Sequence, residues 1–330
     1  MADIGGTHAR LALVKGAPAT PPASGDAVRP DGEPMQAQVL ECRRYDGVED
    51  LITAYLESCG NPSVHCAALA VATAVTGDRI KLTNRAWAFS RQALQARFGW
   101  DELLVLNDFT ALALSLPTLK AGDLMSIPAA EAQADAGPKA LLGAGTGLGM
   151  SGLLPDGRGG WVAIAGEGGH ATIAPHGGLE NAVAACLQRY FSHVSTERVL
   201  SGEGLVNLYN AVCYVNGLPA HALQPAEVVE RGLNGQDPSC DQALDCFCSF
   251  LGGAAGNWAL SLGATGGVYI GGGVAPRLIQ RLSRGRFREA FESKGRLAPY
   301  LRCIPTWVLR DQPFPALRGA AYALAQQQRR

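Results

Sequence analysis

The sequence predicts an α/β protein of two domains, and three features support this. Its 330 residues are more than one ordinary hydrophobic core accommodates and enough for two domains. Short apolar stretches typical of buried strands alternate with stretches of helical periodicity. A glycine-rich turn that contains threonine, followed by an apolar strand, occurs once in each half of the chain, which indicates two related lobes.

The repeated unit is predicted to be a β-hairpin whose tight turn points backbone N–H groups into one concavity. The first copy has its turn at residues 5–7 and its strand at residues 11–14. The second has its turn at residues 143–149 and its strand at residues 150–154. After the first copy, residues 17–38 are rich in proline, alanine, glycine and aspartate without periodicity, so we expect a surface loop there.

Two helices are predicted from their end signals and periodicity. Ser90 should cap a helix over residues 91–98, which stops at Gly99. Apolar residues recur at helical spacing over residues 244–262, where the pair Gly252-Gly253 would let a neighbour pack closely. We therefore expect the second helix to be largely buried.

Charge and composition exclude several classes of function. Lys plus Arg number 28 against 29 for Asp plus Glu, so no net field attracts nucleic acid or anionic lipid, and we expect neither as a partner. The apolar stretches are shorter than the ~20 residues that a membrane span needs. Residues 1–15 lack the features of a signal peptide, so we expect a cytoplasmic protein.

The nine cysteines are scattered without a C-x-x-C pair, which predicts reduced thiols. Cys246 and Cys248 are separated by one residue, which is poor geometry for zinc. Because they lie in an apolar run, we expect both to face the core and assign no structural metal.

The glycine-rich turns are candidate phosphate sites, because glycine lets several N–H groups point at one anion and a threonine hydroxyl adds a donor. Neither turn is a P-loop or a dinucleotide-binding motif. For each turn alone, the alternative is a tight hairpin without a ligand. Asp3 directly precedes the first turn and could hold Mg²⁺ through water, the alternative being a turn-forming aspartate.

A buried strand is predicted at residues 103–106, and Asn107 and Asp108 follow it directly. Ligands of α/β sheets bind beyond the carboxyl ends of the strands. Transfer of a group to a hydroxyl needs a carboxylate that accepts the proton, so Asp108 is a candidate general base. The alternative is that Asp108 only caps a helix over residues 109–116.

Three polar residues suit the hydroxyl groups of a sugar. Glu167 and His170 lie three positions apart in a glycine-rich loop, and Glu197 precedes a short apolar run. A carboxylate accepts hydrogen bonds from two hydroxyls at once, and imidazole can donate or accept. The alternative for Glu167 and His170 is metal ligation, for which no third ligand stands at a suitable spacing.

Six motifs in this order resemble those of the bacterial glucokinase family, within the hexokinase-like, actin-fold superfamily. They are DIGGTHAR at residues 3–10, LNDFTA at 106–111, GAGTGLG at 143–149, GEGGH at 166–170, ERVLSG at 197–202 and GGGV at 271–274. Together they span nearly the whole chain, which makes the resemblance far more specific than any one motif.

The resemblance implies a small and a large α/β domain of ribonuclease-H-like, actin-like fold, with ATP and sugar in a cleft between them. We expect the small domain at residues 1–117 plus 312–330 and the large domain at residues 118–311. It implies ATP-dependent phosphorylation of the glucose 6-hydroxyl with Mg²⁺ as cofactor, and a homodimer.

The resemblance also implies a role for each site residue. Asp108 would be the general base, and the sugar-binding residues would be Asn107, Asp108, Glu167, His170 and Glu197. Phosphates and Mg²⁺ would lie at Ala2, Asp3, Ile4, Gly5, Gly6 and Thr7 and at Gly145, Thr146 and Gly147. Adenosine would lie by Gly271, Gly272 and Gly273.

Two departures from the family pattern are expected to matter. Only Met1 and Ala2 precede Asp3 where relatives have an apolar strand, so we expect that the natural chain begins upstream and that this central strand is missing. Ala74 stands where relatives usually carry proline, which should change only local loop shape.

Three alternatives to a glucose kinase are open. A kinase for another hexose, such as fructose, mannose or an N-acetylhexosamine, is the nearest; the group for several of these carries a cysteine-rich zinc motif, which does not follow His170. A sugar-sensing regulator would want a helix-turn-helix segment. An actin-like polymerising ATPase would have no use for Glu167, His170 and Glu197. ADP or polyphosphate as phosphoryl donor also stays open.

Overall fold

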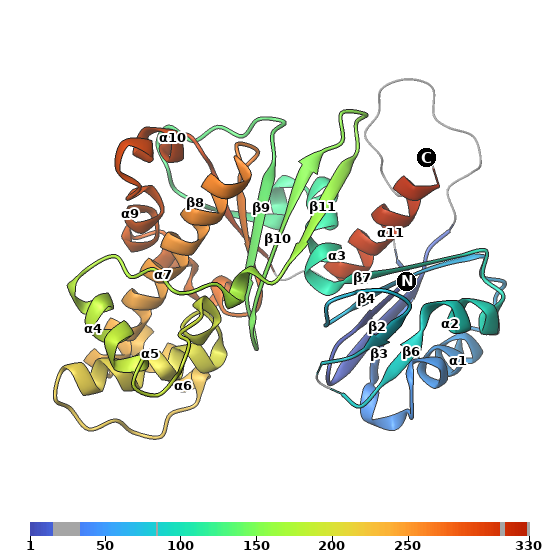
Figure 1. The fold of residues 1–330 in the computed structure, drawn as a ribbon, viewed down its shortest axis with the longest axis horizontal. Coiled ribbons are helices and arrows are strands. Elements are labelled where there is room, and N and C mark those ends of the chain that lie inside the picture. Colours follow the sequence, from blue (N-terminus) through green and yellow to red (C-terminus); the bar gives the residue numbers. More distant parts are fainter. Residues whose placement is uncertain (16–33, 84, 311–313, 329–330) are drawn as a thin grey trace. The chain divides into compact units, whose positions relative to one another are not determined.

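The computed structural model describes residues 1–15, 34–83, 85–310 and 314–328 (Figure 1). The chain divides into two compact units. The first comprises Met1–Lys120, Leu153–Ala165 and Gln312–Arg330, and the second comprises Ala121–Gly152 and Gly166–Asp311. The domain boundaries expected from the sequence stay a prediction.

The first unit is built on a five-stranded sheet with the order β3-β2-β1-β4-β7. The strands are β1 (Ala2–Ile4), β2 (His8–Leu13), β3 (Met35–Glu41), β4 (Cys66–Val71) and β7 (Glu102–Asn107). Strand β1 pairs antiparallel with β2 and parallel with β4, which in turn pairs parallel with β7. The predicted hairpin after the first turn and the predicted strand before Asp108 are therefore confirmed.

The expectation of a missing central strand is wrong, because residues 2–4 themselves form that strand. Three residues suffice here because both neighbouring strands hydrogen-bond to β1. The side chains of Ala2 and Ile4 are also buried in the core of the unit. The short segment is thus fixed by backbone pairing on two sides and by apolar packing.

The expected loop over residues 17–38 is only partly testable. Residues 16–33 lie outside the described residues, but Met35–Glu41 form the edge strand β3, so the loop prediction is wrong for that part. Most β3 side chains are exposed or half-buried, and Gln36 has a φ of 51°. The strand is defined by the antiparallel pairing of its backbone with β2. Its sequence shows no alternation of hydrophobic and polar residues, so it could not be recognised from the sequence.

The described part of the first unit has four α-helices, together with a two-stranded sheet of β5 (Arg79–Lys81) and β6 (Ala88–Ser90). The helices are α1 (Val48–Ser58), α2 (Arg91–Phe98), α3 (Asp108–Ser115) and α11 (Pro315–Gln327). The prediction for α2 is confirmed at both ends: the Ser90 side chain accepts a hydrogen bond from Ala93 N, and Gly99 is left-handed at φ 64°. The last helix, α11, packs on α3 and on β4 (Figure 1).

The second unit contains most of a six-stranded sheet with the order β11-β10-β9-β12-β13-β8. Its strands are β8 (Leu124–Ile127), β9 (Lys139–Ala144), β10 (Leu148–Pro155), β11 (Trp161–Gly166), β12 (Val268–Gly271) and β13 (Thr306–Leu309). Strand β12 pairs parallel with both β9 and β13, and β8 pairs antiparallel with β13. The mixture of parallel strands with covering helices is the α/β class that the sequence predicted.

Seven α-helices belong to the described part of the second unit. They are α4 (Gly178–Leu187), α5 (Gly202–Val215), α6 (Pro225–Leu233), α7 (Pro238–Leu262), α8 (Ile279–Leu282), α9 (Arg286–Glu292) and α10 (Ala298–Arg302). Short 3-10 helices complete the connections, and two of them, η4 (Gly168–His170) and η5 (Thr196–Arg198), carry candidate site residues. Within the described ranges, no helix has the length and apolar character that crossing a membrane requires.

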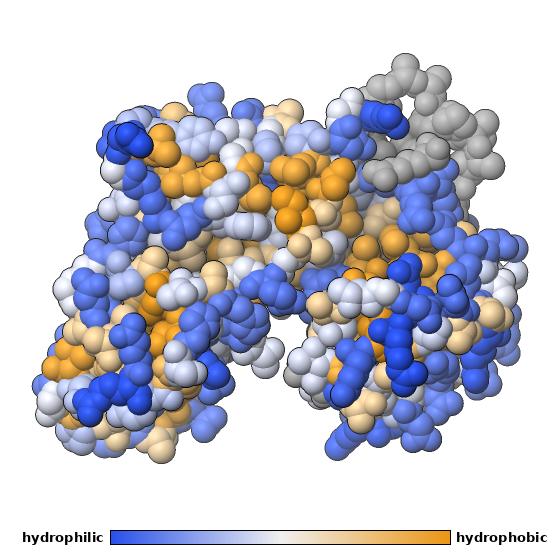
Figure 2. All heavy atoms as spheres, viewed as in Figure 1, coloured by the Kyte–Doolittle hydropathy of each residue, from blue (hydrophilic) through white to orange (hydrophobic). Residues whose placement is uncertain are grey.

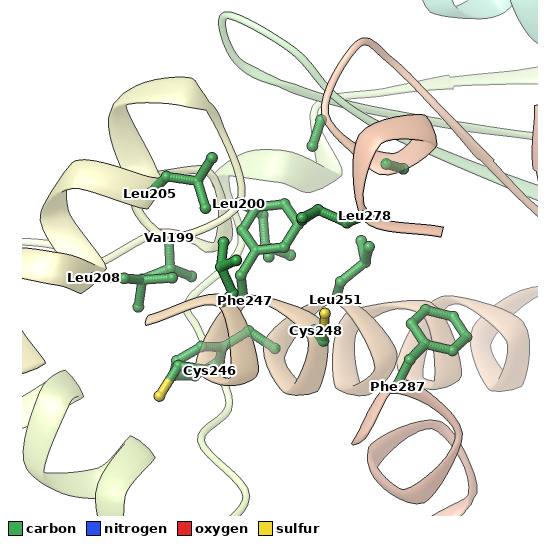
Figure 3. Packing of buried hydrophobic residues seen from close by; sticks show 14 of the residues in the cluster. Val199, Leu200, Leu205, Leu208, Cys246, Phe247, Cys248, Leu251, Leu278 and Phe287 are labelled. Atoms are coloured by element: carbon green, nitrogen blue, oxygen red, sulfur yellow. The ribbon is translucent and has the colours of Figure 1, made fainter. Parts of the chain in front are cut away.

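Helix α7 is the central helix of the second unit and is longer than predicted. It begins at Pro238 because Asp237 caps it, accepting from Ser239 N at 2.8 Å, and it ends at Leu262 as expected. Cys246 and Cys248 are buried, which confirms that they face the core. The ring of Phe247 points toward Leu200 and Leu278 (Figure 3). A Cβ on Gly252 would overlap the carbonyl oxygen of Phe287, which confirms the close packing predicted at this glycine pair.

Arg281 joins α8 to α7 through two ion pairs. Its guanidinium lies 2.7 Å from the carboxylate of Asp241 and 2.9 Å from that of Asp245, while its own side chain is only 13% exposed. Replacing Arg281 with Ala leaves two carboxylates side by side without their cation. We expect a loss of roughly 1–2 kcal/mol in the free energy of unfolding, since both carboxylates are partly screened by water. The shift of the urea midpoint measures it.

Arg277→Ala is the control for this prediction, because Arg277 is exposed and lies just before the same helix. Its effect should stay within about 0.5 kcal/mol. Equal midpoints for the two variants would contradict a stabilising role for the Arg281 ion pairs.

Candidate active site

The first glycine-rich turn connects β1 to β2 and is closed by its own backbone. Gly5 N donates to His8 O at 3.1 Å, and Cys42 N donates to Thr7 O at 2.9 Å. Thr7 is exposed, so its hydroxyl is accessible to a ligand. The turn therefore has the form of a hairpin, as predicted from its sequence, and it carries an exposed threonine.

Asp3 lies on β1 just before this turn and pairs with Arg10 on β2 at 3.3 Å. Burial raises the pKa of the Asp3 carboxyl, and the nearby Arg10 guanidinium offsets this only in part. A mostly buried carboxylate with such incomplete compensation is suited to a further cation at its free side. The residues present at this turn thus fit a water-bridged Mg²⁺.

Arg85 was not among the predicted site residues, yet it lies at the same turn. Its Nη1 donates to Gly6 O at 3.2 Å, and its guanidinium stacks on the Trp87 ring at 4.6 Å. The signal in the sequence is a cation two positions before a tryptophan, which is weak without the fold. The contact places a positive charge beside a turn predicted to bind phosphate.

Asn107 and Asp108 stand where β7 ends and α3 begins. The Asn107 side-chain oxygen accepts from Phe109 N at 3.0 Å and from Thr110 N at 3.2 Å, so Asn107 is the helix cap. Its amide nitrogen donates to Thr73 O at 3.2 Å. The Asp108 carboxylate accepts from Phe109 N at 2.8 Å and is the first residue of α3. The Asp108 side chain therefore lies at the N-terminal, positive end of the α3 dipole.

The second glycine-rich turn lies between β9 and β10. Gly145 N donates to Gly147 O at 2.8 Å, and Gly145 O accepts from Gly202 N at 2.8 Å. Thr146 at the tip is exposed. The turn is therefore tied both to itself and to the first residue of α5.

Glu197 reaches this second turn directly. Its Oε2 accepts from Leu148 N at 2.8 Å, and a Cβ on Gly147 would overlap the same oxygen. Val199 and Leu200, which follow in the chain, are fully buried among the side chains of α5 and α7 (Figure 3). The core thus fixes the backbone from which Glu197 extends.

Glu167 and His170 lie beside the segment of Glu197. Thr196 N and its hydroxyl both donate to Ala171 O, at 2.8 and 3.0 Å, and an isolated β-bridge joins Thr172 to Ser195. Glu167 and His170 are exposed at the two ends of η4. Three of the five predicted sugar-binding residues, Glu167, His170 and Glu197, are therefore carried by two segments in contact.

Two further glycines allow these segments to approach the second turn. A Cβ on Gly169 would overlap Leu148 O, which brings η4 against the start of β10. Gly272, at a φ of 85°, follows β12, and a Cβ there would overlap Ala144 O. Val274 N also donates to Ala144 O, at 3.3 Å. The glycine run Gly271–Gly273 therefore lies against the carboxyl end of β9, which leads into the second glycine-rich turn.

The predicted site residues are thus shared between the two units. Residues 2–7, Asn107 and Asp108 belong to the first unit. Residues 145–147, Glu167, His170, Glu197 and residues 271–273 belong to the second. Among the described residues, no group of three or more His, Cys, Asp or Glu side chains could hold a metal ion by themselves.

Comparison with known proteins decides the family. A family profile described as glucokinase matches residues 1–327. A glucokinase of Paramagnetospirillum magneticum is 45% identical over 97% of this chain and 95% of its own length. This chain belongs to the glucokinase family.

Solved structures agree with this glucokinase assignment. A glucokinase from an Antarctic psychrotroph has a TM-score of 0.87 and 34% identity, covering 98% of both chains. A ROK-family glucokinase from Streptomyces griseus, solved with glucose and AMPPNP, has a TM-score of 0.59 and 19% identity over 99% of this chain and 98% of its own. The glucokinase chain described here therefore has the two-domain, actin-like and ribonuclease-H-like α/β fold that its motifs predicted.

Proposed function

We propose that this member of the glucokinase family transfers the γ-phosphate of ATP to the 6-hydroxyl of glucose. The observation that carries the proposal is the set of contacts around Leu148. Its N–H binds Glu197 and its carbonyl lies against Gly169, directly after a glycine-rich turn. These contacts bring residues that we propose to bind hydroxyls next to a turn that we propose to bind phosphate, within one unit.

In this proposal Asp108 accepts the proton of the 6-hydroxyl as the new P–O bond forms. Asn107, Glu167, His170 and Glu197 hold the remaining hydroxyls, since carboxylates accept from two hydroxyls and amide and imidazole groups donate or accept. A pocket that binds every hydroxyl discriminates against sugars that lack one, because its polar groups would be left unpaired. The ROK-family glucokinase solved with glucose and AMPPNP shares the fold of this chain, and this shared fold supports the choice of sugar.

The nucleotide would lie against the glycine-rich segments. At residues 5–7 and 145–147, the threonine hydroxyls and the backbone N–H groups other than Gly5 N and Gly145 N, which donate within their own turns, would bind the phosphates. Residues 271–273 would lie by the adenosine. Asp3 would hold Mg²⁺ through water. When bound, Mg²⁺ neutralises charge that develops on the phosphates during transfer. The guanidinium of Arg85, fixed at Gly6 O, would add a positive charge at the same turn.

The assay that tests this proposal measures ADP release from Mg²⁺-ATP with glucose, mannose, fructose and N-acetylglucosamine in parallel. Release that depends on glucose supports it. Faster release with another sugar would favour the nearest alternative, a kinase for that hexose. No release with any sugar, together with glucose binding seen by thermal shift, would favour a sugar sensor.

Asp3 offers a test of the Mg²⁺ assignment that combines stability with activity. Because the pKa of Asp3 is raised in the folded protein, ionisation of this carboxyl lowers the free energy of unfolding. This loss is absent below the ordinary carboxyl pKa of about 4 and grows as the pH rises through the raised pKa. Asp3→Asn should therefore unfold roughly 2 °C higher at pH 7, and the difference should shrink towards pH 3.

The same variant should lose affinity for Mg²⁺-ATP, with KM rising about tenfold while glucose binding is kept. Differential scanning fluorimetry across pH and initial rates at varied Mg²⁺-ATP give the two readouts. A variant that is less stable at neutral pH but binds Mg²⁺-ATP normally would show that Asp3 serves only its pair with Arg10.

The remaining proposals concern the setting of the enzyme. We propose a cytoplasmic homodimer without nucleic acid or membrane partners, in line with the near-zero net charge. Figure 2 shows hydrophobic side chains at separate places on one face, among them regions beside α10 and over β10 and β11. Exposed apolar side chains among the described residues include Leu154 on β10, Val162 on β11, Leu297 just before α10 and Tyr300 on α10. Light scattering of the purified protein tests the dimer.

A further inference from the structure

Glu197, which its motif predicts to bind sugar, also contacts the second glycine-rich turn. Its Oε2 accepts from Leu148 N at 2.8 Å, and Leu148 follows the second glycine-rich turn directly. Within the described residues, this is the hydrogen bond that the structure gives to the Glu197 carboxylate. A residue proposed to bind sugar is thus bonded to the backbone of a turn proposed to bind phosphate.

The second glycine-rich turn and the Glu197 carboxylate are also in close steric contact. A Cβ on Gly147 would overlap Oε2 of Glu197. A Cβ on Gly145, two residues earlier in the same turn, would meet no atom within 4 Å. A side chain at Gly147, unlike one at Gly145, would therefore collide with the carboxylate and displace it.

Movement of Glu197 is restricted to its side chain. Its carbonyl oxygen accepts from the Ser201 hydroxyl at 2.9 Å, and Val199 and Leu200 are fully buried. With the backbone held in this way, the position of the carboxylate is set by its side-chain torsions and by the Leu148 N–H. Anything that fixes the carboxylate therefore also fixes the amide that follows the turn.

We propose that Glu197 couples the two substrate sites: bound glucose holds its carboxylate, and the carboxylate in turn orders the phosphate-binding turn of residues 145–147. A carboxylate has about four acceptor positions, so one hydrogen bond from Leu148 N leaves room for sugar hydroxyls. Coupling of this kind is reciprocal, and the nucleotide raises the affinity for glucose by the factor by which glucose raises the affinity for the nucleotide. The inference rests on the proposed function, because it takes glucose and ATP as the ligands.

The first test measures glucose binding by calorimetry, in the absence of nucleotide, to the full chain and to two alanine variants. Gly147→Ala should fold, since the only atom in the way is the end of a flexible side chain, but the methyl group displaces the carboxylate. Losing a charged hydrogen-bond acceptor for the sugar should weaken glucose binding roughly tenfold to hundredfold. Gly145→Ala should leave the glucose Kd within about twofold and change nucleotide binding alone.

The second test uses the unaltered protein and does not depend on any variant. Hydrogen exchange of the segment that contains the Leu148 amide is followed with and without saturating glucose, again without nucleotide. Glucose should slow the exchange of this amide by roughly tenfold, because it holds the acceptor in place. Equal exchange rates in the two conditions would overturn the coupling.

The outcomes separate this inference from the proposed function. If the unaltered chain does not bind glucose, the proposed function itself is wrong. If the unaltered chain binds glucose and Gly147→Ala binds it equally well, the function stands and the coupling through Glu197 is refuted. An equal loss of glucose affinity in both alanine variants would also refute the coupling, because of the two glycines only Gly147 lies against the Glu197 carboxylate.

Discussion

Asp108→Asn is expected to lower kcat by about a thousandfold while the Kd for glucose stays within about threefold of its normal value. The asparagine oxygen can still accept from Phe109 N, a contact of 2.8 Å in the structure, so α3 should keep its first turn. The amide can also still bind a sugar hydroxyl. It cannot take the proton of the 6-hydroxyl, so only the chemical step should suffer. Steady-state rates and glucose calorimetry together measure the split.

Glu167→Gln is the matched comparison, because it makes the same change from carboxylate to amide in the second unit. We expect this variant to weaken glucose binding by about tenfold and to change kcat far less, since Glu167 is proposed to hold a hydroxyl that does not react. Comparable losses of glucose binding in both variants would undo the division of roles between them.

Gly319→Ala is expected to destabilise the first unit by about 3 kcal/mol, the upper range for overpacking a core. Gly319 lies in α11 where that helix crosses α3, and a Cβ there would overlap the carbonyl oxygen of Ala111. Because the obstacle is backbone, no rotation of a side chain can relieve it. The two helices must separate, which uncovers the apolar side chains between them.

Chemical unfolding followed by circular dichroism measures this loss, and Gly178→Ala provides its control. Gly178 is also a helical glycine, at the start of α4, but a Cβ there would meet nothing within 4 Å. This control should be neutral or slightly stabilising, since alanine has the higher helix propensity. A Gly319→Ala protein as stable as the control would show that α11 can be moved without loss.

The sequence predicted those parts of the fold that depend on local signals. The helix over residues 91–98 was predicted to the residue because Ser90 and Gly99 mark its ends. The loop was expected to lie between early strands, but the start of the edge strand β3 at Met35 was not predicted, because the segment carries no periodic pattern and pairs with β2 through its backbone. The central strand was missed because three residues carry too little pattern, and its identity comes from neighbours on both sides.

The candidate site follows the same division. Short local motifs predicted the glycine-rich turns, Asp108 and the set of Glu167, His170 and Glu197 as site residues, and these roles stay predictions. The bond between Glu197 and Leu148 joins residues far apart in sequence, and Arg85 reaches Gly6 from another part of the chain. Contacts of this kind arise from tertiary folding, so no local sequence pattern predicts them.

The position of α11 has a consequence for the order in which the protein can fold during synthesis. Helix α11, which covers α3 and contributes Ala320 and Leu324 to the packing on β4, is separated in the chain from the sheet and α3 by most of the second unit, so it is synthesised long after them. At the ~5–20 residues per second of translation, the sheet and α3 leave the ribosome on the order of ten seconds or more before their covering helix exists. The apolar surface of the sheet and α3 that α11 later covers therefore stays accessible to chaperones until α11 has been synthesised.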